Sequence, residues 1–81
     1  MNIERMQHKG QLAECRKKFK TLDTEASGLI ILVRSFLNPY EEDVTKLDVE
    51  KAFHSMSRLR DVINEMKLLG TKIQKMEEDL D

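Results

Sequence analysis

The chain of 81 residues has no tryptophan, one cysteine, one proline, three glycines and only four aromatic residues. A single cysteine excludes an internal disulfide framework and suits a reducing compartment. The longest apolar run, residues 29–33, has five residues, whereas a membrane-spanning helix needs about 20. The N-terminal segment also lacks the apolar core of a secretory signal. We therefore expect a soluble, cytoplasmic protein with no membrane contact.

Charged residues are abundant, at 36% of the chain, and nearly balanced, with a formal net charge of -1. This composition is typical of long helices with one apolar stripe, and it provides no overall field for nucleic acid or membrane. Residues 1–37 carry seven basic and four acidic residues, and residues 38–81 carry seven basic and eleven acidic residues. We interpret the asymmetry as two halves of opposite sign that pair with each other.

Residues 12–36 contain a strong coiled-coil pattern. With Leu12 at heptad position a, the a and d positions are all apolar or small: Leu12, Cys15, Phe19, Leu22, Ala26, Leu29, Val33 and Phe36. The register passes unbroken through Ser27-Gly28, where glycine costs about 1 kcal/mol relative to alanine. We expect a continuous, bent helix, and a break at Gly28 is the alternative.

A bend follows, because Pro39 lacks an N–H and disfavours the helical conformation at Asn38. Thr45 and Asp48 are both candidate N-caps for a second helix. We place helix 1 at about residues 3–37, the bend at 38–45 and helix 2 at about 46–79. The seam of helix 2 is expected to follow Val49, Ala52, Met56, Leu59, Ile63, Met66, Gly70 and Ile73, with a second stripe, Val62, Met66, Leu69, Ile73, Met76 and Leu80, taking over after Met66.

The predicted fold class is all-α, a single domain formed by an antiparallel, coiled-coil-like hairpin of two helices. When the chain is folded at residue 42 or 43, position n lies opposite about 85 − n, and the seams meet layer by layer. A two-helix hairpin buries only its seam, however. The apolar residues left over form a second face near the bend: Ile30, Ile31, Leu32, Leu37, Phe53 and Val62.

We expect this second face to meet a copy of itself and give a dimeric four-helix bundle. Binding of a different protein, and a third short helix that folds back over the face, are the alternatives. The function expected from this arrangement is a non-enzymatic interaction or structural module.

Two charged segments permit an alternative function, a small regulator that binds nucleic acid or the transcription machinery. The basic segment consists of Arg16, Lys17, Lys18 and Lys20; acidic neighbours favour a solvated face over contact with nucleic acid. The acidic bend of Glu41, Glu42 and Asp43 lacks the ligand spacing of a calcium loop, and acidic residues at a helix start usually complement the helix dipole. Its shape is analogous to the coiled-coil finger that some transcription factors insert into RNA polymerase, but the chain lacks their globular domain.

The sequence shows no nucleophile with its base, no phosphate loop and no paired catalytic carboxylates. His8 and His54 have no partner at ligand spacing, and Cys15 occupies a seam position. We therefore expect no enzymatic activity, cofactor or metal.

The bend "FLNPYEEDVTKLDVEKA" and the helix end "IQKMEEDLD" resemble segments of small helical proteins encoded by Mu-like bacterial prophages. The resemblance begins at Phe36 and covers the second half of the chain. It implies a bacterial or phage accessory protein of the cytoplasm, and it brings no catalytic motif with it.

Overall fold

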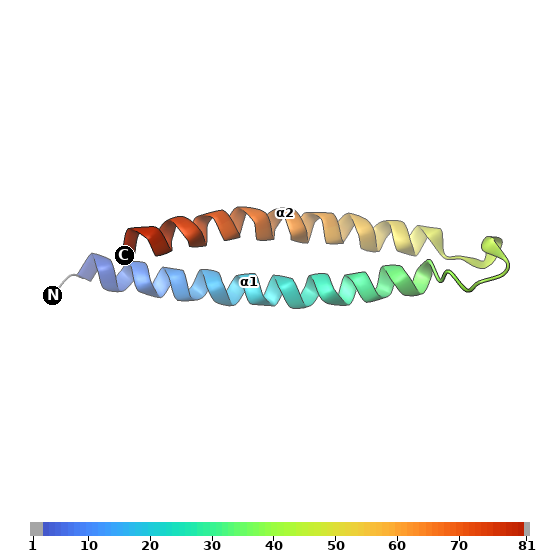
Figure 1. Ribbon diagram of the computed structural model, residues 1–81, viewed down its shortest axis with the longest axis horizontal. Helices are drawn as coiled ribbons and strands as arrows, with labels where there is room; N and C mark the ends of the chain where they lie inside the picture. The colour runs from blue at the N-terminus through green and yellow to red at the C-terminus, as the bar shows by residue number, and fades with distance from the viewer. Residues whose placement is uncertain (1–2, 81) are drawn as a thin grey trace.

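The protein is an antiparallel pair of long helices joined by a bend (Figure 1). The computed structural model describes residues 3–80. Helix α1 spans Ile3–Phe36, a single 3-10 turn η1 spans Val44–Lys46, and helix α2 spans Val49–Leu80. The start of α1 and the end of α2 lie at the same end of a rod that measures 66 × 16 × 14 Å.

Helix α1 runs without interruption through Gly28. A Cβ atom placed on Gly28 would meet nothing within 4 Å, so the glycine is not needed for close packing. The helix ends at Phe36, two residues before Asn38-Pro39. The side-chain carbonyl of Asn38 then accepts a hydrogen bond from the Tyr40 N–H at 3.0 Å, which turns the chain out of the helical direction.

Two aspartates organise the bend. The Asp43 carboxylate accepts hydrogen bonds from the backbone N–H of Thr45 at 3.0 Å and from its hydroxyl at 2.6 Å, and it caps η1. Helix α2 begins only after Asp48, whose carboxylate accepts a bond from the Lys51 N–H at 3.0 Å. Leu47 has extended backbone angles (φ -68, ψ 136). It therefore separates η1 from α2, which is why α2 begins at Val49 and not at residue 46.

The seam of α1 contains the eight residues of the sequence pattern, and each of them is buried or partly buried. The centre of the core consists of Leu22, Ala26 and Val62, with Leu29, Leu59, Met66 and Leu69 packed around them. Among residues 3–80, six hydrophobic residues are buried, and Val62 alone has no exposed surface. A two-helix rod has a thin core, because each helix covers only one side of the other.

In the first half of α2 the predicted seam is correct at Ala52 and Leu59 and wrong at the members that alternate with them. Val62, which we expected on an outward face, has 0% exposure and is the most buried side chain of the core. Val49, Met56 and Ile63, which we expected in the seam, are 56%, 51% and 37% exposed. The second stripe in fact continues along the whole helix without a register shift, and every member is buried or partly buried: Ala52, Ser55, Leu59, Val62, Met66, Leu69, Ile73, Met76 and Leu80.

Packing explains the choice between the two stripes. Val62 packs in one buried cluster with Leu22 and Ala26, and the small Ala52 and Ser55 lie on the same stripe, where they are buried and partly buried. Ile63 lies one residue, about 100°, further around the helix, and so points away from this contact.

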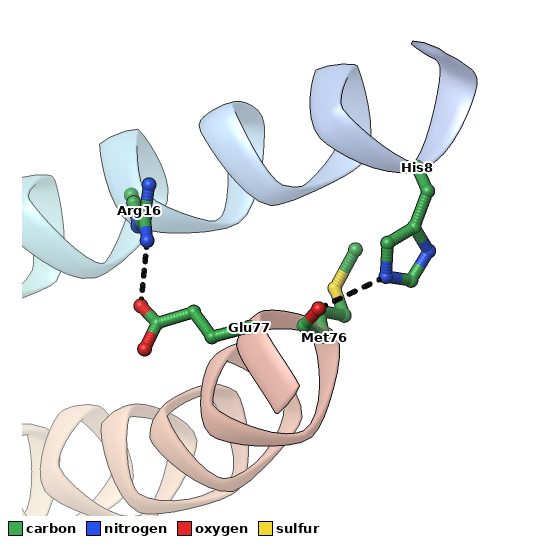
Figure 2. Close-up of polar contacts among 4 residues, drawn as sticks. All are labelled: His8, Arg16, Met76 and Glu77. Carbon is green, nitrogen blue, oxygen red and sulfur yellow. Dashed lines mark hydrogen bonds and ion pairs between the residues drawn. The ribbon is translucent and has the colours of Figure 1, made fainter. Parts of the chain in front are cut away.

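Polar contacts between the helices run from the termini past the middle of the rod, as far as Glu25 and Arg58. Three are ion pairs: Arg16–Glu77 at 2.7 Å, Lys18–Glu65 at 3.0 Å and Glu25–Arg58 at 2.8 Å. In addition, Arg5 donates to the Leu80 carbonyl at 3.0 Å, and a ring nitrogen of His8 lies 3.2 Å from the Met76 carbonyl (Figure 2). Toward the bend, the described residues of the two helices meet through the apolar seam.

Candidate interaction surface

The two sides of the rod differ in polarity. In an antiparallel pair, the e positions of both helices line one side of the seam and the g positions line the other. The ion pairs Lys18–Glu65 and Glu25–Arg58 join g positions, so that side is called the ionic flank. On the opposite side, the described residues form one ion pair between the helices, Arg16–Glu77, near the termini.

Closer to the bend, this opposite side is apolar. Five of its e positions, two on α1 and three on α2, and the neighbouring b position Phe53 carry apolar side chains. We call these six residues the apolar flank: Ile30, Leu37, Val49, Phe53, Met56 and Ile63. Their exposed fractions run from 37% for Ile63 to 65% for Phe53. Two helices far apart in sequence thus place partly exposed apolar groups along one continuous side, which is unusual for the surface of a monomer.

The six residues predicted as an association face do not lie together. Ile30, Leu37 and Phe53 belong to the apolar flank. Ile31, 68% exposed, lies on the back of α1 at position f, and Leu32, 46% exposed, lies at a g position on the ionic flank. Val62 is removed from the set, because it fills the core of the hairpin.

Sequence reasoning missed Val49, Met56 and Ile63 as surface residues because it placed them in the seam. A shallow depression lies on this part of α2, lined by Met56, Leu59, Arg60, Ile63, Asn64 and Lys67. The apolar flank is therefore not flat, and Phe53 lies next to a hollow formed by its own helix.

The basic segment of α1 is divided by the fold. Arg16 pairs with Glu77 on one side of the rod, and Lys18 pairs with Glu65 on the other (Figure 2 shows the first pair). Lys17 and Lys20 form no ion pair with the described residues. Two of the four residues of the predicted nucleic-acid patch thus form ion pairs within the hairpin, on opposite sides of the rod.

The acidic bend is held by local hydrogen bonds. The Thr45 hydroxyl and N–H lower the pKa of Asp43 because they stabilise its charged form. A carboxylate oxygen of Glu41 accepts a bond from the Asp43 N–H at 3.2 Å, and Asp48 caps α2. These carboxylates therefore act as caps for the turns and for the second helix.

The remaining candidate side chains lie apart from one another. His8 is near the termini, where it contacts the Met76 carbonyl, and His54 lies near the bend, edge-on to Phe53 with ring centroids 6.1 Å apart. Cys15 is partly buried in the seam. Over residues 3–80, no three His, Cys, Asp or Glu side chains are grouped as a metal site. Neither helix has a described stretch long and apolar enough to cross a membrane.

No protein-family model matches the chain, and no curated protein or solved structure is similar enough to count as a match.

Proposed function

We propose that this protein is a non-enzymatic interaction module that pairs with a second copy through the apolar flank and forms a four-helix bundle. The observation that carries the proposal is the contrast between the two sides of the rod. Ion pairs connect the helices along the ionic flank, whereas the apolar flank presents Ile30, Met56 and Ile63 to solvent between 37% and 51% exposed.

The total surface supports association. The hairpin exposes 6694 Å², whereas a compact monomer of 9.5 kDa exposes about 5,000 Å². The excess, about 1,700 Å² on one chain, is about twice the area of roughly 800 Å² that one partner buries in a standard protein–protein interface. A second hairpin on the apolar flank would cover part of this excess and thicken the core.

The test is a pair of matched substitutions on α1. Ile30 and Leu32 are almost equally exposed, at 44% and 46%, but they lie on opposite sides of the rod. Ile30→Glu places two carboxylates in the proposed interface and removes two buried side chains worth about 1.5–3 kcal/mol each. It should weaken the dimer by a factor on the order of 100 or more and leave the helix content unchanged. Leu32→Glu is the control and should stay dimeric.

Sedimentation equilibrium between 1 and 200 μM, together with far-UV circular dichroism, measures both properties. A wild-type protein that remains a folded monomer over this range would refute the proposal. So would a Leu32→Glu variant that dissociates as readily as Ile30→Glu. Global unfolding of Ile30→Glu would place Ile30 in a core of the single chain and would also count against the apolar flank as an interface.

A further inference from the structure

We infer that the two copies dock in opposite directions, so that Phe53 of each copy fills the depression on α2 of the other. The inference rests on the proposed self-association, and it adds the direction of docking and the residues that set it. Two observations on the described surface carry it, one of shape and one of charge.

The length of the apolar flank determines which residues of the two copies face each other. On α2 the flank runs from Val49 to Ile63, and Met56 lies at its midpoint. When two flanks are superposed in opposite directions, Val49 of one copy lies opposite Ile63 of the other. Phe53 then lies opposite Leu59.

Leu59 lines the depression together with Met56, Arg60 and Ile63. Phe53 is the most exposed member of the flank, at 65%, so a protruding ring faces a hollow. The Arg60 guanidinium borders the same hollow, and a cation over an aromatic ring adds attraction. Docking in the same direction about a two-fold axis would instead place Phe53 opposite α1 of the other copy, away from both depressions.

The two ends of the apolar flank lie beside segments of different charge. The segment from 38 to 51 contains five acidic and two basic residues. At the other end of the flank, residues 60–67 of α2 contain two basic and two acidic residues, and residues 17–24 of α1, which the Lys18–Glu65 pair places beside them, contain three basic and one acidic. Lys67 is four residues, about 6 Å, past Ile63.

Docking in opposite directions brings the acidic bend of each copy to this basic stretch of the other, twice per dimer. Docking in the same direction places the two acidic bends side by side, where like charges repel. Shape and charge therefore favour the same arrangement.

A spin label at the bend distinguishes the two directions. Val44 is 71% exposed, so Val44→Cys accepts a label outside the seam, and Cys15→Ala, a smaller side chain at a partly buried seam position, removes the other thiol. With opposite directions, Val49 lies opposite Ile63, so the 14 helical residues between them separate the two Val49 positions by about 21 Å along the rod, and the labels lie further apart because Val44 precedes α2 in each copy. With the same direction, they are separated only by the width of the rods, 14 to 16 Å in cross-section. Double electron–electron resonance measures this distance; a short distance would overturn the inference.

A charge exchange provides the second measurement. Glu42→Lys and Lys67→Glu should each weaken the wild-type dimer roughly tenfold, and the double variant should recover most of that loss. A tighter dimer for Glu42→Lys alone would mean that the two bends face each other, and the inference would fail. Sedimentation separates this failure from that of the proposed function: a dimer with the wrong label distance defeats only the direction, whereas a wild-type monomer defeats both.

Discussion

Val62 and Val49 permit a direct test of the packing, because one substitution can be made at two positions of the same helix. Val62 has 0% exposure and contacts the centre of the core, whereas Val49 is 56% exposed. The heptad pattern read from the sequence assigned them the other way, with Val49 in the seam and Val62 outside. Val62→Ala and Val49→Ala therefore give opposite results under the two assignments.

The magnitude follows from the burial of Val62. The substitution removes two methyl groups from a site without solvent contact, which costs about 1.6 kcal/mol in transfer free energy. The space left behind adds up to about 1 kcal/mol if the helices do not close over it, and the better helix propensity of alanine returns about 0.5 kcal/mol. We expect a loss of about 2 kcal/mol in the free energy of unfolding. For a chain of this size, that lowers the melting temperature by roughly 8–16 °C.

Val49→Ala should change the free energy of unfolding by less than about 0.5 kcal/mol, because its side chain is already half in water. Urea unfolding followed by far-UV circular dichroism measures both values, at submicromolar protein so that association contributes least. If Val49→Ala proves the more destabilising of the two, the observed seam of α2 is wrong.

Three further predictions concern single turns. Gly28→Ala should stabilise the protein by about 1 kcal/mol, since the new methyl group meets open space; a lower melting temperature would indicate a kink that needs glycine. Asp48→Ala should cost about 1 kcal/mol through loss of the α2 cap, and Asp48→Asn, which keeps an acceptor, should recover most of it in the same urea titration. The pKa of Asp43 is lowered from 3.8 by Thr45, so its contribution to stability is present above about pH 4 and is lost as the pH falls through the folded-state pKa. Carboxyl NMR titration should show this lowered pKa, and Thr45→Val should return it toward the ordinary value.

The all-helical hairpin could be predicted because the signals for α1 were unambiguous. All eight a and d residues are apolar or small, and a strong breaker, Pro39, follows within a few residues of the last one. In such a segment the period of the pattern fixes the buried face.

The pattern in α2 was ambiguous because its apolar face is too wide for a single seam. Val49, Met56 and Ile63 form one stripe, and Leu59, Val62 and Met66 belong to the adjacent one. The true seam also contains Ser55, a polar residue that hides the pattern. Hydrophobicity alone cannot choose between neighbouring stripes; the choice depends on how side chains interlock with Leu22 and Ala26, which becomes known only when the two helices are docked.

The same ambiguity affected the candidate surface. Counting apolar residues outside the presumed seam identified a surplus near the bend, but it grouped Ile31 and Leu32 with residues on another side of the rod. Their positions around α1 separate them from Ile30 by about 100° and 200°. The ion pairs that define the ionic flank depend on the register of the two helices, and for that reason the polarity of each side emerged only from the structure.

The uneven placement of polar contacts between the helices gives the two ends of the rod different sensitivities. Salt at molar concentration screens exposed ion pairs, so it should loosen the end at which Arg16 meets Glu77. Cooling weakens apolar contacts instead, so it should loosen the end at which Val33 and Phe36 pack. Amide hydrogen exchange measured in molar salt and at low temperature should therefore show opening that begins at opposite ends of the rod.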